Sequence, residues 1–239
     1  MCQRLIILIL SFIILVSQSC ESFLSEPKTL PQIDYSGQID SIVDIDGNVY
    51  RTIGIGSQIW MSENLKTLRL NDGTRISLIK DDSIWQYHDR IPATCWYNND
   101  SVHFSKPFGL LYNGFVVSTD LLCPTGWHVP SEGDWNTLTN FLGGSEKAGG
   151  YLKDYCSNLW SDPNYCYVDN IGFFALPGGR RNHFGGRFYD INDIGYWWTS
   201  SSKNEFYAYA RRIFHYETSI SRSESNKRDG YSVRCIKDN

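Results

Sequence analysis

The sequence predicts an α+β fold in which short helices and long loops accompany a mainly antiparallel, twisted sheet. Three observations indicate this class: a well-capped helix in mid-chain, a hairpin signal near the start, and short aromatic or β-branched runs toward the end. The chain has 239 residues, a length that suits a targeting segment followed by one domain.

The central helix is predicted to begin at Ser131. Serine is a good N-cap, and Asp134 can bond back to it as in a capping box. Apolar residues then recur at helical spacing until two glycines at 143–144 end the pattern. We interpret Glu132 and Asp134 as charges that favour a helix N-terminus, and His128, in an apolar context, as a structural histidine.

An antiparallel meander is predicted over residues 43–61. The Asp-Gly pair at 46–47 separates two runs rich in β-branched residues, which is a hairpin signal because a type I′ turn needs positive φ. A second turn at residues 56–57 leads into a strand at 58–61, and residues 71–74 mark another turn.

The middle of the chain, residues 84–122, combines many aromatic residues with little periodicity, so we expect long loops folded over the core. A second short helix is predicted over residues 145–152, although two internal glycines weaken it by about 1 kcal/mol each. Four later runs are predicted as strands: residues 171–176, 195–200, 206–213 and 231–236.

Residues 1–20 are predicted to be a bacterial lipoprotein signal peptide. Arg4 precedes an apolar run of twelve residues, 5–16, which is too short to span a membrane and suits a signal-peptide core. Small residues then precede Cys20, which we expect to carry lipid and anchor the protein to the cell envelope, at the outer membrane or cell surface. In an ordinary secretory signal this cysteine would be incidental. Residues 21–40 are predicted to be a tether and residues 41–239 the folded domain.

Charge and cysteine spacing exclude several classes of function. The net charge of −4 becomes −5 when residues 1–19 are removed, since only Arg4 is lost, and a mildly acidic protein has no electrostatic footprint for nucleic acid. No Cys-x-x-Cys spacing is present, which argues against a zinc site or a thioredoxin-type redox pair. We expect neither a metal nor a cofactor.

Seven motifs occur in order along the chain: DGNVY at 46–50, QIWMSENL at 58–65, CWYNND at 95–100, CPTGWHVPSEGDW at 123–135, ALPGGR at 175–180, YWW at 196–198 and SVRCIKD at 232–238. With them the chain resembles the Fibrobacter succinogenes major paralogous domain family of bacterial envelope proteins. The resemblance implies a C-type-lectin-like fold, which is similar to that of formylglycine-generating enzymes.

Two activities that this wider resemblance suggests lack their residues here. Formylglycine-generating enzymes hold copper with two cysteines shortly before the terminal strand, and residues 207–231 contain none. Calcium-dependent lectins use Glu-Pro-Asn or Gln-Pro-Asp, and neither tripeptide occurs. The nearest match, Asp-Pro-Asn at 162–164, is interpreted as a turn.

The resemblance also implies a disulfide between Cys123 and Cys235, because each lies in one of the motifs and a secreted context favours long-range bridges. Cys156 and Cys166 are expected to form a local second bridge. Cys95 would then remain unpaired.

The glycine-rich, basic segment 178–187 is the candidate recognition loop. It lacks the Gly-Lys-Ser/Thr ending of a phosphate loop, so nucleotide binding is not expected. We predict ligand contacts from Arg181, His183 and Arg187, with Tyr189 nearby, and assign Arg180 to structure. A turn-rich connector with a structural arginine is the competing interpretation.

Aromatic residues make up 15% of the chain, and most of them are expected to pack in the core. A few in loops are expected instead to form a flat face: Trp160, Tyr165, Tyr167 and Tyr189. We therefore predict a non-enzymatic, membrane-tethered module that binds a glycan or a protein or serves the envelope structurally. The alternative is an enzyme distantly related to formylglycine-generating enzymes with a loop-built site. A shallow aromatic groove would favour binding, and a deep polar pocket would favour catalysis.

Overall fold

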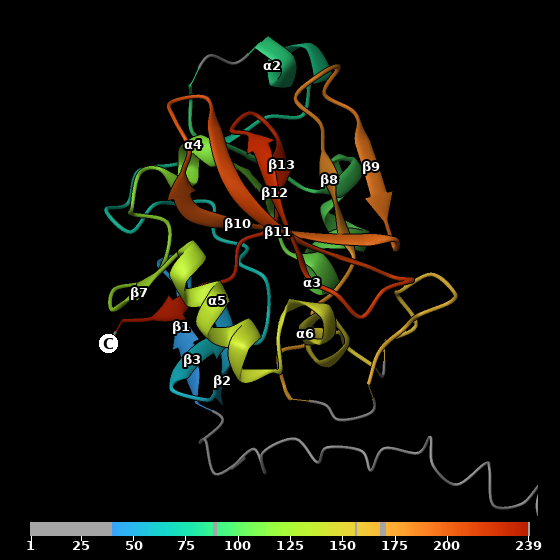
Figure 1. The fold of residues 1–239 in the computed structure, drawn as a ribbon. Helices are drawn as coiled ribbons and strands as arrows, with labels where there is room; N and C mark the ends of the chain where they lie inside the picture. Colours follow the sequence, from blue (N-terminus) through green and yellow to red (C-terminus); the bar gives the residue numbers. More distant parts are fainter. Residues whose placement is uncertain (1–39, 88–89, 156, 168–170, 239) are drawn as a thin grey trace, which may run out of the picture. The chain divides into compact units, whose positions relative to one another are not determined.

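The computed structural model describes residues 40–87, 90–155, 157–167 and 171–238, and it has the predicted mixed α+β architecture (Figure 1). Antiparallel pairing dominates its three sheets, and all of its helices are short. Cys20 and the tether up to residue 39 lie outside the described residues, so the lipid anchor stays a prediction.

The first sheet joins the two ends of the domain. It consists, in spatial order, of β1 (Ser41–Val43), β2 (Val49–Ile55), β3 (Gln58–Met61), β14 (Ile236–Lys237) and β7 (Trp127–His128). All pairs are antiparallel, and Ile236 lies opposite both Trp60 and His128. Figure 1 shows the blue first strands beside the red end of the chain. The predicted meander over 43–61 is confirmed.

A second sheet gathers strands from most of the remaining chain. Its order is β4 (Ser77–Leu78), β5 (Ala93–Cys95), β6 (Leu111–Asn113), β13 (Gly230–Tyr231), β8 (Gly178–Arg181) and β9 (Phe188–Ile191). Only its β4–β5 pair is parallel. The third sheet is an antiparallel meander of β10 (Ile194–Ser202), β11 (Tyr207–Phe214) and β12 (Ser221–Asn226).

The helices are α2 (Asp82–Tyr87), α3 (Ser101–Phe108), α4 (Gly114–Val117), α5 (Glu132–Phe141) and α6 (Ser145–Leu152), with a 3-10 turn η1 at Tyr97–Asn99. Helix α5 begins as predicted, because Ser131 and Asp134 form a complete capping box. Trp135 and Leu138 of its apolar stripe are fully buried, and Phe141 is partly buried.

Helix α6 confirms the predicted second helix and explains its two glycines. A Cβ at Gly149 would lie 2.2 Å from the carbonyl oxygen of Ser219, and one at Gly150 would lie 2.7 Å from the ring of Tyr167. These positions need glycine because other segments pack directly against the helix backbone, and the packing offsets the low helix propensity.

The long loops predicted over residues 84–122 are wrong, because this region holds three helices and two strands. Side-chain caps at their N-termini stabilise two of these short helices. The side chain of Asp100 accepts hydrogen bonds from the first backbone amides of α3, and Asn113 accepts one from Val116 at the start of α4. Such caps stabilise helices that are too short for a periodic pattern to develop.

Two predicted strands also differ from the structure. Residues 171–176 form no strand beyond a bridge at Ala175, because the side chains of Arg234 and Trp160 bond the carbonyls that a neighbouring strand would otherwise use. The run 231–236 divides between β13 and β14, since Ser232 bridges to Trp197.

The main core contains buried residues from all three sheets, and aromatic side chains fill much of it. Trp198 donates to the carbonyl of Tyr112 at 2.7 Å, and its ring lies 4.5 Å from that of Tyr231. Trp60, Trp135 and Phe173 pack together with ring centroids 5.0 to 5.9 Å apart. Large rings thus supply the buried area that short elements lack.

The predicted disulfide between Cys123 and Cys235 is present and ties the approach to β7 to the terminal strand region. Cys95 is a buried thiol whose pKa is raised to about 12 by burial, so it is not a reactive nucleophile. Cys166 carries a thiol in the structure, and Cys156 lies outside the described residues, so their bridge stays a prediction.

Candidate functional site

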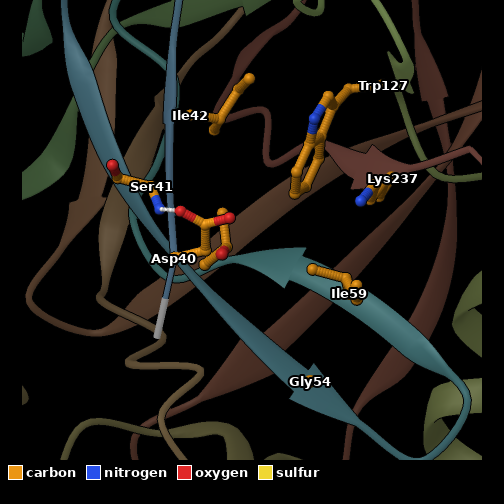
Figure 2. Close-up of a pocket in the computed structure, with 8 residues that line it drawn as sticks. Asp40, Ser41, Ile42, Gly54, Ile59, Trp127 and Lys237 are labelled. Carbon is orange, nitrogen blue, oxygen red and sulfur yellow. Dashed lines mark hydrogen bonds between the residues drawn. The ribbon is translucent and has the colours of Figure 1, made fainter. Parts of the chain in front are cut away.

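One surface hollow lies on the five-stranded sheet where the described chain begins (Figure 2). It encloses about 450 Å³, and Figure 2 shows Trp127 and Lys237 side by side, facing Ile42 and Asp40. The Asp40 carboxylate already accepts the backbone N–H of Ser41 at 2.8 Å. With one amine and one carboxylate in its lining, this hollow offers few groups to hold a ligand.

A second hollow, the aromatic groove, has a richer lining. It encloses about 480 Å³ and is lined by Tyr87, Arg90, Phe115, Phe206, Tyr207, Asn226 and Arg228. Three of its rings are substantially exposed: Tyr87 by 74%, Phe206 by 45% and Tyr207 by 39%. Exposed rings beside guanidinium groups are typical of a recognition surface.

The turn between β10 and β11 forms one wall of the groove and is held rigidly. The side chain of Asn204 accepts the backbone N–H groups of Phe206 and Tyr207, both at 2.9 Å. Arg90 pairs with Glu205 at 3.0 Å and lies 4.9 Å above the ring of Phe206. The backbone that carries the two rings is therefore ordered by these bonds before any ligand arrives, which lowers the entropy cost of binding.

Helix α2 forms another wall of the groove, and its buried side is packed against the rest of the protein. Trp85 is fully buried, and Arg181 stacks on its ring at 4.5 Å. Arg228 donates to the carbonyl of Gln86 at 2.9 Å, so the end of β12 is joined to α2. The groove is thus built from segments far apart in sequence.

The segment 178–187 is a β-hairpin and not a flexible loop. Strands β8 and β9 pair antiparallel, with Arg181 opposite Phe188. The backbone N–H of Gly185 donates to the side chain of Gln86 at 3.1 Å, and Figure 1 shows this turn beside α2. Arg180 pairs with Asp190 at 2.7 Å, as expected of a structural arginine.

The predicted ligand contact by Arg181 is wrong, because its side chain is fully buried. It donates to the carbonyls of Gly186, Ile79 and Lys80 and pairs with Asp82 at 2.8 Å. These bonds use its donors inside the protein, and their role is to hold α2 against the hairpin.

His183 is partly exposed and oriented by a buried carboxylate. Its Nδ1 lies 2.7 Å from Oδ1 of Asp229, which also accepts the His183 backbone N–H at 2.9 Å. Tyr231 donates to the other oxygen of Asp229 at 3.4 Å, and burial, together with that carboxylate, raises the Tyr231 pKa above its usual range. The imidazole is therefore held in one orientation beside α2.

The remaining predicted contacts lie apart from the groove. Arg187 and Tyr189 are both exposed, but neither is among the described residues that line the groove. Phe184, which sequence reasoning did not single out, is the most exposed part of the turn at 78%. The flat face proposed from loop aromatics does not form as predicted, since Trp160 is buried and donates to the carbonyl of Ala175.

Comparison with known families assigns the chain to one of them. A model of the Fibrobacter succinogenes major domain matches residues 53–237, which is more than half of the sequence. The chain belongs to this family. No curated protein and no solved structure matches it.

In this Fibrobacter succinogenes major domain the helix-start motif is joined to the end of the chain through His128. Its Nδ1 lies 2.6 Å from the carboxylate of Asp238, and its Nε2 lies 3.3 Å from that of Asp134. The side chain is 43% exposed, so the expected structural role rests on hydrogen bonds to two carboxylates and not on apolar burial.

Two features are absent from the described part of this Fibrobacter succinogenes major domain. It contains no cluster of three or more His, Cys, Asp or Glu side chains suited to a metal ion. It also contains no helix with the length and apolar character needed to cross a membrane.

Sequence reasoning missed the groove of this Fibrobacter succinogenes major domain for a simple reason. Arg90, Phe115, Phe206 and Arg228 come from four separate segments, and no local pattern connects them. The available signal was Phe206-Tyr207, an aromatic pair at a strand start directly after the polar run 201–205.

Proposed function

We propose that this chain is a lipid-anchored protein of the cell envelope whose C-type-lectin-like domain binds a glycan without catalysing a reaction. The aromatic groove is the observation that supports this proposal best. Its lining combines Phe and Tyr rings with two arginines and an asparagine. Rings stack on the C–H faces of sugars, and guanidinium and amide groups bond their hydroxyls.

The size and rigidity of the groove fit this role. Its volume of about 480 Å³ lies within the range of small-molecule sites, which run from about 300 to 1,000 Å³. Glu205 and the carbonyl of Gln86 hold the guanidinium groups of the two arginines in place in the groove lining. A preformed, shallow, aromatic site favours binding over catalysis.

A glycan array probed with the full chain tests the proposal, followed by affinity measurements on the best ligand. The double variant Phe206→Ala/Tyr207→Ala should bind about tenfold or more weakly, as expected for aromatic anchors. Tyr216→Ala is the matched control, because Tyr216 is 46% exposed and lies outside the groove lining. Equal affinity of wild type and double variant would contradict the proposal, as would groove-dependent binding of a protein alone.

The anchor is tested separately by metabolic labelling with a fatty-acid analogue. Label should enter the wild-type protein and not Cys20→Ser. If both proteins are labelled equally, Cys20 is not the lipidation site.

Catalysis at His183 is the second candidate, because a buried carboxylate orients its imidazole as it would a general base. The distinguishing experiment follows the fate of the bound glycan. Turnover that is lost in His183→Ala, while binding persists, would replace the binding proposal with an enzymatic one.

A further inference from the structure

A third hollow, the Arg234 cleft, is independent of the aromatic groove. It encloses about 520 Å³. Its walls come from β2 and the segment after β3, from the last turn of α3, and from residues 174–176, with Arg234 in the lining. None of the residues that line the aromatic groove takes part.

Arg234 places a positive charge in the protein interior without a bonded counter-charge. Its guanidinium donates to the carbonyls of Phe173 and Phe174 and to Oδ1 of Asn64, all of them neutral acceptors. The group is fully buried over the ring of Phe173, and its Nε has no hydrogen-bond partner. Burial lowers the pKa of Arg234 to about 9, and the Glu63 carboxylate offsets this effect only in part.

The rim of the cleft adds further positive charge. Arg51 and Glu63 pair with each other at 2.8 Å and so neutralise one another. Lys66 lies 5.8 Å above the ring of Tyr50 and, like Lys106, forms no ion pair within the described residues. Four basic and two acidic side chains line the cleft, so it carries a net charge of +2 in a protein of net charge −4. An anion would be drawn to it.

The remaining lining is suited to an organic molecule and not only to a bare ion. Phe174, Leu176 and Pro107 provide apolar surface, and Ser62 and Ser105 provide hydroxyls. We propose that the Arg234 cleft binds a small hydroxylated carboxylate of the hexuronate class. Its carboxylate lies toward Lys66 and Lys106, with the buried charge of Arg234 behind them, and its ring lies against Phe174.

Calorimetric titration of the purified full chain with glucuronate at low ionic strength tests this site, with glucose as the neutral match. Glucuronate should bind saturably and glucose should not. Lys106→Gln should weaken glucuronate binding by about tenfold, as for the loss of a charge-assisted hydrogen bond, whereas the exposed Lys147→Gln should leave it unchanged. These variants alter surface side chains and avoid the folding risk of changing Arg234.

Three outcomes would overturn the proposal: no saturable glucuronate binding, equal binding of glucose, or an unchanged affinity in Lys106→Gln. Inorganic phosphate that bound as tightly as glucuronate would reduce the site to a general anion site and also refute the assignment. Phe206→Ala/Tyr207→Ala should bind glucuronate normally, and a loss of binding there would place the ligand in the aromatic groove instead.

Discussion

Removing the disulfide between Cys123 and Cys235 should destabilise the domain strongly, because the bridge closes a very long loop. The two cysteines are 112 residues apart in sequence. In the chain-entropy treatment a closed loop of this length restricts the unfolded chain by about 16 cal/mol/K, which corresponds to about 5 kcal/mol at 25 °C. This is comparable to the whole net stability of many domains.

Packing adds a smaller contribution in the same direction. Both cysteines are buried in the main core, and the carbonyl of Cys235 accepts the N–H of Met61 at 3.0 Å. Replacement of both by alanine keeps the backbone bonds and removes two sulfur atoms from packed surroundings. We therefore expect the free energy of unfolding of the double variant Cys123→Ala/Cys235→Ala to fall by at least the loop-closure contribution of about 5 kcal/mol.

Urea unfolding followed by tryptophan fluorescence measures this loss, since the buried tryptophans report on the core. Wild type should be compared with and without reductant, and the double variant serves as the control for the other cysteines. A loss of less than about 1 kcal/mol in the double variant would refute the loop-entropy reasoning. Further destabilisation of the double variant by reductant would indicate the bridge predicted between Cys156 and Cys166.

Three further predictions concern the packing and caps of the fold. Lys153→Met should cost about 3 to 5 kcal/mol in urea unfolding, because the buried Nζ donates to three carbonyls at 2.8 to 3.0 Å; a cost below about 1 kcal/mol would contradict this. Burial acts to raise the Asp134 pKa, but hydrogen bonds from Ser131 and His128 outweigh it, and the pKa lies below its usual value. The stability from this carboxylate is therefore present above the unfolded pKa of about 4 and is lost as the pH falls below it. Asp134→Asn should flatten the acid limb of a plot of stability against pH. Parallel acid limbs for the wild type and the variant would disprove the cap. Gly149→Ala should destabilise by about 1 to 3 kcal/mol because its Cβ meets the Ser219 carbonyl. Gly133→Ala, whose Cβ would make only an ordinary contact of 3.4 Å with Ser131 Oγ, should be neutral or stabilising by up to about 1 kcal/mol; similar thermal shifts for both would reject the close-packing argument.

Elements that local chemistry determines could be predicted from the sequence. Helix α5 follows from one serine, one aspartate and an apolar stripe, and the strands around the turn at 46–47 follow from a single Asp-Gly pair. Strands β10 and β11 each contain several aromatic and β-branched residues in a run long enough to recognise. In each case the residues that specify the element lie within it.

Elements that depend on distant partners could not be predicted. Strand β12 has the sequence Ser-Arg-Ser-Glu-Ser-Asn, and it forms a strand only because β11 offers a full row of backbone partners. The apolar run 171–176 has the composition of a strand, yet side chains bond its carbonyls instead. The candidate site shows the same limit, since burial of Arg181 depends on α2, about 100 residues earlier in the chain.

The position of β14 between β3 and β7 has a consequence for how the protein is made. Residues 236–237 fill an interior place, between β3 and β7, in a sheet whose other strands precede residue 129. A ribosome releases the chain from its N-terminus, so β3 keeps an open backbone edge until residues 236–237 have been synthesised. The domain can therefore reach its native sheet order only after this late strand has left the ribosome.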